Sequence, residues 1–310
     1  MRSFCFALLS LVACGPVALA DPIYLALGDS SAFGETNRTQ NPSDGDRGYV
    51  RPFADYLGSV YGTRPTVVNF AINGETSGSY FNGTGRVSSD GQSLNTNYSS
   101  VPTNPYPQYQ RLQDSFSNPA TNAEVRAVSV QLGANNLDAT ASSPGFLALP
   151  PDQQQLLILA TLGAFQNDYV DILGDLAVRF PNATLYALGY HNPYNGDPTH
   201  PFYPLADPAV QGLNQVVAGV APVFGATYID VYGAVHPNEA SLTLIGTFPT
   251  DPVNYVHLND AGYAAVGDQF IRAAGGPTSV PAPASLLLFG LGGVALFARR
   301  KWRGRQPAAA

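Results

Sequence analysis

The stretch IYLALGDSSAFG, residues 23–34, decides the fold. Ile23–Leu27 is apolar and rich in residues that favour β-strands, and a polar, glycine-flanked turn follows it directly. Comparable runs recur between helical stretches along the chain. They predict further strands at residues 66–71, 125–132, 183–189 and 226–231.

Helical periodicity is clearest at residues 152–180, where apolar residues repeat close to every 3.6 positions. Pro151 opens this helix and Pro181 closes it. Shorter helices are expected at residues 52–60, 207–218 and 260–273. Strands that alternate with helices indicate a sheet covered on both faces. The sequence therefore predicts a three-layer α/β/α, flavodoxin-like domain with a mostly parallel five-stranded sheet.

Polar residues and glycines follow three of these strands at the point where each ends. Ser30 comes after the first strand, Gly74 after the second and Asn135 after the third. Because ligands of open α/β sheets bind outside the carboxyl ends of the strands, these residues are candidates for one site.

Two long polar insertions, residues 35–48 and 77–122, interrupt the alternation of strands and helices. Long loops of this kind act as lids or binding surfaces, and the alternative is a disordered excursion.

Ser30 and His257 form the pair on which the functional interpretation rests. A serine hydroxyl is a weak nucleophile until a base removes its proton, and imidazole titrates close enough to neutral pH to do so.

Four blocks, in order, resemble those of the SGNH or GDSL-type hydrolases, an esterase and lipase family. The blocks are GDS at residues 28–30 with Gly34, NFAINGET at 69–76, GANN at 133–136, and NYVHLNDAGY at 254–263. The resemblance covers residues 23–274. It implies the SGNH hydrolase form of the flavodoxin-like fold and a carboxylic ester hydrolase.

The resemblance also implies roles for single residues. Ser30 is the expected nucleophile and His257 the expected base. The backbone N–H groups of Ser30 and Gly74 and the side-chain amide of Asn135 are the expected oxyanion hole, the donors that bind the negative oxygen of the tetrahedral intermediate.

The chain departs from the family pattern at two positions. Asn254 stands where the family has an aspartate, three residues before the histidine. Its amide oxygen can still orient the imidazole, so Asn254 is our third catalytic candidate; Asp251 or a backbone carbonyl are the alternatives. Asn136, in place of aspartate, is expected to affect the support of its loop more than the chemistry.

Each candidate also has a structural interpretation. Ser30 could be a helix N-cap, Asn135 could cap a turn, and Asp29 is expected to be structural. His257 could be a surface histidine, which is the fate expected of the loop residues His191, His200 and His236.

Residues 1–20 have the positive start, short apolar run and small-residue site of a secretory signal peptide, with cleavage after Ala20. The alternatives are a buried N-terminal helix and a lipoprotein cleavage box at Leu11–Cys14. Both cysteines, Cys5 and Cys14, lie in this leader. The mature chain, residues 21–276 plus a tail, would then have no disulfide and no cysteine chemistry.

The tail, residues 277–310, contains a Val-Pro-Ala-Pro motif, the apolar run 284–298 and a basic cluster. This arrangement resembles the PEP-CTERM sorting signal, although Ala282 replaces the usual glutamate. The resemblance implies an exosortase-type processing enzyme as partner and attachment to the membrane through residues 284–298 before processing. The alternative is a plain membrane anchor.

Between the leader and the tail lie nine basic and all 22 acidic residues, a net charge of −13. Such an acidic body argues against binding to nucleic acid. We expect no cofactor and no metal, because no cluster has metal-ligand spacing and no glycine-rich phosphate loop follows a strand.

The sequence thus predicts an exported esterase, periplasmic, cell-surface or secreted, that acts on lipid esters or acylated glycans. The alternative is a non-catalytic matrix or polysaccharide-binding protein on the same fold.

Overall fold

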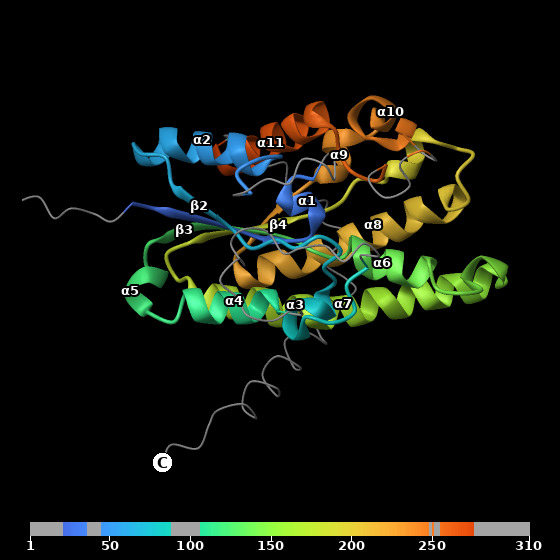
Figure 1. Ribbon diagram of the computed structural model, residues 1–310, viewed down its shortest axis with the longest axis horizontal. Helices are drawn as coiled ribbons and strands as arrows, with labels where there is room; N and C mark the ends of the chain where they lie inside the picture. The colour runs from blue at the N-terminus through green and yellow to red at the C-terminus, as the bar shows by residue number, and fades with distance from the viewer. Residues whose placement is uncertain (1–20, 36–44, 88–105, 248–249, 251–254, 276–310) are drawn as a thin grey trace, which may run out of the picture.

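The five predicted strands form one all-parallel sheet in the order β2-β1-β3-β4-β5. The computed structural model describes residues 21–35, 45–87, 106–247, 250 and 255–275 (Figure 1). The strands are β1 (Ile23–Gly28), β2 (Thr66–Asn69), β3 (Val125–Gln131), β4 (Thr184–Leu188) and β5 (Thr227–Ile229).

Helices cover both faces of this sheet. The α-helices are α1 (Ser30–Phe33), α2 (Val50–Tyr61), α3 (Ser77–Asn82), α4 (Gln108–Ser115), α5 (Pro119–Asn122), α6 (Ala134–Ala141), α7 (Pro151–Arg179), α8 (Tyr203–Val220), α9 (Val231–Val235), α10 (Glu239–Leu242) and α11 (Asp260–Gly275). Short 3₁₀ turns are η2 (Phe146–Ala148), η3 (Pro193–Gly196), η4 (Ala221–Phe224) and η5 (Ile245–Thr247).

Alternate residues of β1 enter two separate cores. Leu25 and Leu27 pack in the core under α4, α7 and α8, whereas Tyr24 and Ala26 pack in the core under α2, α9 and α11. In Figure 1 these two groups of helices lie on opposite sides of the strands. Because successive side chains of a strand point to opposite faces, a strand buried on both sides must be apolar throughout, as residues 23–27 are.

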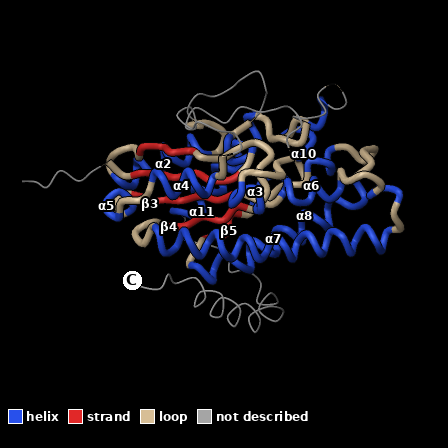
Figure 2. Tube along the Cα trace, turned by 60° about the horizontal axis from the view of Figure 1, so that its bottom comes forward, coloured by secondary structure: helices blue, strands red, loops and turns tan. Residues whose placement is uncertain are grey.

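The longest helix, α7, is long and apolar enough to cross a membrane by length and composition. Its second half is instead part of the core, since Phe165, Tyr169, Ile172 and Leu176 are fully buried. Figure 2 shows α7 running alongside the sheet and past its end. These contacts account for the 3.6-residue period in the sequence.

The predicted three-layer fold is confirmed, and the strands and the four predicted helices differ from expectation by a few residues at their ends. The sequence patterns do not predict the short helices α1, α6, α9 and α10 or the helices of the second insertion, α3, α4 and α5. The described parts of that insertion, 77–87 and 106–122, contain these three short helices, α3, α4 and α5.

Candidate active site

Ser30 is the first residue of α1, directly after the end of β1, and it is half-buried. The N-cap of this helix is Asp29, whose carboxylate accepts a hydrogen bond from Ser31 N at 2.9 Å. The interpretation of Ser30 as an N-cap is therefore wrong. Because Asp29 caps the helix, the Ser30 hydroxyl is not used as a helix cap.

The turn into α1 depends on a glycine. Gly28 has φ +138°, and a Cβ atom on it would lie 2.2 Å from the carbonyl oxygen of Gln131 on β3. At this φ a side chain would point at the neighbouring strand, so only a residue without one fits.

Gly74 lies in the loop after β2, where its φ of +73° favours glycine. The loop is a turn closed by Glu75 N, which donates to Ile72 O at 3.1 Å. The carbonyl of Gly74 accepts from Val87 N at 2.9 Å. Two backbone hydrogen bonds thus hold the peptide that joins Gly74 to Glu75.

Asn135 joins the first and second blocks. Its Nδ2 donates to Glu75 O at 3.0 Å and to Asp29 Oδ2 at 3.3 Å. Those partners are the neighbours of Gly74 and Ser30 in sequence. Asn135 does not cap a turn, because the N-cap of α6 is Gly133. Asn135, one expected oxyanion-hole residue, therefore contacts the sequence neighbours of the other two, Ser30 and Gly74.

Asp29 is buried at the centre of these contacts. Its Oδ2 also accepts from Tyr190 Oη at 2.6 Å. Burial raises the pKa of Asp29 to about 7, and the hydrogen bond from Tyr190 acts in the opposite direction. Tyr190 is itself fixed by Asn214 of α8, which accepts from Tyr190 N at 2.7 Å and donates to Tyr190 O at 2.8 Å.

His257 is buried and precedes α11. Its carbonyl accepts from Leu244 N at 2.9 Å. The preceding residue, Val256, offers its carbonyl to His191 Nε2 at 3.1 Å. Tyr190 and His191 are consecutive residues after β4. Tyr190 contacts Asp29, the neighbour of Ser30, and His191 contacts Val256, the neighbour of His257.

Within the described ranges, no hydrogen bond joins the Ser30 hydroxyl to the His257 ring; such bonds in ligand-free enzymes are often long. Asn254 and Asp251, the candidates for orienting the ring, lie outside the described residues. The predicted signal peptide, residues 1–20, and the tail, residues 277–310, lie outside them as well.

Two of the three loop histidines expected at the surface are buried, so that expectation is wrong. His191 is buried against Val256, and burial lowers its pKa to about 4. His200 is buried against the ring of Tyr194, with ring centroids 4.4 Å apart. His236 is 46% exposed and pairs with Glu239 at 2.8 Å.

Asn136 supports the loop rather than the site. Its Oδ1 accepts from Ser77 N at 3.0 Å, and its Nδ2 donates to Ser77 Oγ at 2.9 Å. Ser77 Oγ in turn donates to Asp168 on α7 at 2.7 Å. This agrees with the structural role expected of Asn136.

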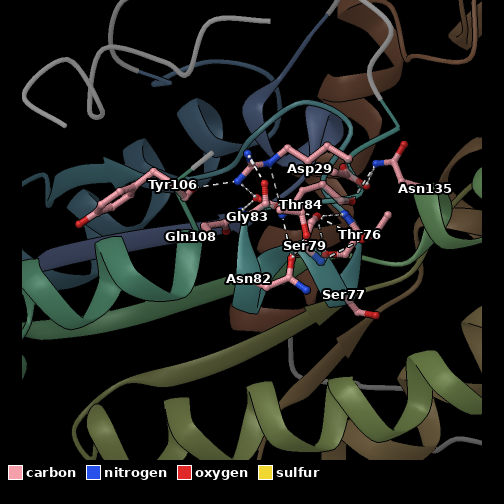
Figure 3. A network of polar contacts seen from close by, with 12 residues as sticks. Asp29, Thr76, Ser77, Ser79, Asn82, Gly83, Thr84, Tyr106, Gln108 and Asn135 are labelled. Carbon is pink, nitrogen blue, oxygen red and sulfur yellow. Dashed lines mark hydrogen bonds and ion pairs between the residues drawn. The ribbon is translucent and has the colours of Figure 1, made fainter. Parts of the chain in front are cut away.

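The sequence patterns did not single out Tyr190, Glu75 or Gln108. Glu75 could have been noticed as a charged residue beside the glycine of an otherwise uncharged block. For Gln108 and Tyr190 no local signal exists, because their partners lie 80 and 161 residues away. Figure 3 shows Gln108 and Asn135 on either side of Thr76 and Ser79.

No group of three or more His, Cys, Asp or Glu side chains that could hold a metal ion occurs in the parts of the chain described above.

Residues 26–265 match the sequence model of the GDSL-like lipase/acylhydrolase family. Residues 279–301 match the PEP-CTERM protein-sorting motif, which implies export and sorting to the cell surface. Both resemblances seen in the sequence are thereby confirmed. A comparison with curated protein sequences found no similar protein.

Solved structures share the fold at low sequence identity. A lipase from a goat rumen metagenome has a TM-score of 0.55 at 16% identity, covering 82% of this chain and 97% of that one. Phospholipase A1 from Streptomyces albidoflavus has a TM-score of 0.54 at 16% identity, covering 82% and 99%. An extracellular lipase from Streptomyces rimosus has a TM-score of 0.53 at 17% identity, with the same coverage as the phospholipase.

Proposed function

The chain belongs to the GDSL-like lipase/acylhydrolase family, and from this we propose that it is an exported serine esterase. The observation that carries the proposal is the pair of hydrogen bonds from Asn135 to Asp29 and to Glu75 O. Through them, three sequence blocks that a chance resemblance would leave scattered meet at one edge of the sheet.

In the proposed reaction, Ser30 Oγ attacks the carbonyl carbon of an ester while His257 takes the hydroxyl proton. The protonated imidazole then gives that proton to the leaving alcohol. Water, activated by the same imidazole, attacks the acyl-enzyme and releases the carboxylic acid.

The negative charge on the tetrahedral carbonyl oxygen needs donors that are already fixed. The Ser30 N–H is at the first position of α1, where an amide has no acceptor within the helix. Gly74 is held in a closed turn. Both N–H bonds of the Asn135 amide have acceptors, Glu75 O at 3.0 Å and Asp29 Oδ2 at 3.3 Å, so this amide would give up the longer bond to Asp29 when it binds the oxyanion. Donors that need little rearrangement during the reaction give the largest stabilisation.

We assign the orientation of the His257 ring to Asn254. An amide oxygen accepts a hydrogen bond from the imidazole N–H but carries no charge to stabilise the imidazolium. The enzyme is therefore expected to be slower than one with aspartate at this position.

The proposed substrates are carboxylic esters of lipids or of acylated glycans. The lipases and the phospholipase that share the fold favour lipids, and the sorting motif favours an extracellular substrate. In this proposal residues 1–20 are removed as a signal peptide, residues 21–276 form the enzyme, and residues 277–310 hold it at the membrane until an exosortase-type enzyme processes it.

The alternative is a non-catalytic polysaccharide-binding protein of the extracellular matrix. The uncharged Asn254 at the position of the usual aspartate favours it.

The test is hydrolysis of 4-nitrophenyl acetate together with labelling by a fluorophosphonate probe. The unmodified protein should do both, and Ser30→Ala should lose both. The matched control is Ser31→Ala, the next residue of α1, which should keep the unmodified rate. If the unmodified protein neither hydrolyses the ester nor takes the label, the esterase proposal fails and the binding protein is favoured.

A further inference from the structure

A buried glutamine from the second insertion is bound into the end of β1. Gln108, the first residue of α4, is completely buried. Its Oε1 accepts from Gly28 N at 2.8 Å, and its Nε2 donates to Gly28 O at 2.8 Å. The side-chain amide thus pairs with both backbone groups of Gly28, as a neighbouring strand would.

The same amide reaches the loop that carries Gly74. Gln108 Nε2 also donates to Glu75 Oε2 at 3.1 Å. The Glu75 side chain has no exposed surface, and Arg86 Nε lies 3.1 Å from its Oε1. Burial raises the pKa of Glu75, and the charge of Arg86 opposes that shift. The Glu75 carboxylate is therefore hydrogen-bonded to Gln108, which binds the end of β1, and ion-paired with Arg86.

Arg86 completes the connection between the described flanks of the insertion. Its guanidinium donates to Tyr106 O at 2.8 Å and to Gly83 O at 3.1 Å. The residue after it, Val87, donates to Gly74 O. Figure 3 shows Tyr106, Gly83 and Gln108 within one network of polar contacts. Both flanks of the insertion are thus attached to the loop of Gly74.

Gly28 is two residues before Ser30, and Glu75 is next to Gly74. We propose that Gln108 is a positioning residue that sets the separation of the Ser30 and Gly74 amides by binding both segments at once. The inference rests on the proposed function, because those amides matter only if they bind an oxyanion.

Oxyanion donors are sensitive to small displacements, since the charge they bind exists only in the transition state. Loosening Gln108 should therefore lower kcat and leave KM almost unchanged. Removing one donor outright typically costs about 10²–10³ in kcat. Displacing two donors without removing them should cost less, about 10- to 100-fold.

The experiment compares Gln108→Met with Gln110→Met in the full chain. Gln110 is on the same helix, but it is exposed, and its side chain donates to Asp114 Oδ1 at 2.8 Å. For each protein we would measure kcat and KM with 4-nitrophenyl acetate, well below its melting temperature. Amide hydrogen exchange would be measured for peptides covering residues 28–34 and 72–77.

We expect Gln108→Met to lower kcat about 10- to 100-fold with KM within about twofold. Exchange in both peptides should accelerate on the order of tenfold, as expected for a lost hydrogen bond in a locally opening segment. Gln110→Met should change neither quantity. If Gln108→Met does not fold, Gln108→Asn, which is too short to reach both partners, takes its place.

A folded Gln108 variant with unchanged kcat and unchanged exchange would overturn the inference. A variant that melts earlier but keeps full kcat while folded would also overturn it, because that is the behaviour of a merely structural residue. If the unmodified protein is inactive, the proposed function fails separately. The exchange rates then still decide whether Gln108 fastens the two segments.

Discussion

Tyr190 Oη donates a 2.6 Å hydrogen bond to Asp29 Oδ2 across 161 residues of sequence. The bond joins the end of β4 to the residue before Ser30, and Tyr190 is held at its own backbone by Asn214. Asp29 therefore receives donors from three elements: α1 through Ser31, α6 through Asn135 and the β4 end through Tyr190. The loop that carries Ser30 is fixed by a buried carboxyl group.

Above about pH 8, where Asp29 is ionised, replacing Tyr190 by Phe should destabilise the protein by about 1.5–3 kcal/mol, the usual worth of a hydrogen bond to a charged group. The ring stays in the core, so only the bond to Asp29 is lost. Urea unfolding measures the difference. The same substitution at Tyr203, which is 38% exposed, should change stability by less than about 0.5 kcal/mol. Equal effects at the two positions would contradict the importance of this bond.

The adjacent residues Asn135 and Asn136 should differ in their effect on catalysis. Asn135→Ala removes a proposed oxyanion donor together with its hydrogen bonds to Asp29 and Glu75 O, and it should lower kcat by about 10²–10³. Asn136→Ala removes two hydrogen bonds to Ser77. It should cost about 1–3 kcal/mol of stability and reduce kcat much less. Steady-state kinetics and urea unfolding of both variants check this. A larger kcat loss at Asn136 would reverse our assignment.

His191 should make the protein less stable in mild acid. Its pKa is lowered to about 4 in the folded state, whereas an unfolded histidine titrates near 6.5. Between these values the unfolded chain binds a proton that the folded chain does not, so stability is lost as pH falls from about 6.5 to about 4.

The variant His191→Gln keeps a donor for Val256 O but does not titrate. Its unfolding free energy should fall less steeply below pH 6.5, by up to about 3 kcal/mol at pH 4. Above pH 7 the two proteins should differ by a constant amount. Unfolding at several pH values gives both curves, and parallel curves over the whole range would refute the prediction.

Substituting two glycines with positive φ, Gly28 and Gly62, should distinguish the cost of backbone strain from the cost of a steric collision. Gly28→Ala would place Cβ 2.2 Å from Gln131 O, whereas Gly62→Ala at φ +80° meets nothing within 4 Å. The Gly62 variant should lose about 1–2 kcal/mol, the cost of the left-handed conformation. The Gly28 variant should lose more than about 4 kcal/mol. Thermal unfolding compares them, and similar losses would mean that β1 and β3 can move apart.

The sequence predicts best what depends on local periodicity. The second half of α7 is fully buried along one face, so its period of 3.6 is strong, and the two-sided burial of β1 makes residues 23–27 apolar throughout. In contrast, α6 has the sequence ANNLDATA and no buried residue, so no apolar period marks it.

The candidate site was predicted where short motifs carry it and missed where distant residues support it. Ser30, Gly74 and Asn135 stand in recognisable blocks. Gln108 and Tyr190 act through partners far away in sequence, and only the folded chain brings them there. His191 and His200 were expected at the surface because prolines and asparagines surround them, yet Val256 and the ring of Tyr194 cover them.

The absence of a side chain at residue 28 has a consequence for surveys of this family. The backbone conformation at residue 28 would aim a Cβ at Gln131 O and so forbids any larger residue there, whether or not the neighbouring hydroxyl still reacts. Relatives that have lost their nucleophile should therefore keep this glycine for as long as they keep the sheet. The presence of this glycine in a related sequence therefore indicates the fold and is not evidence of catalytic activity.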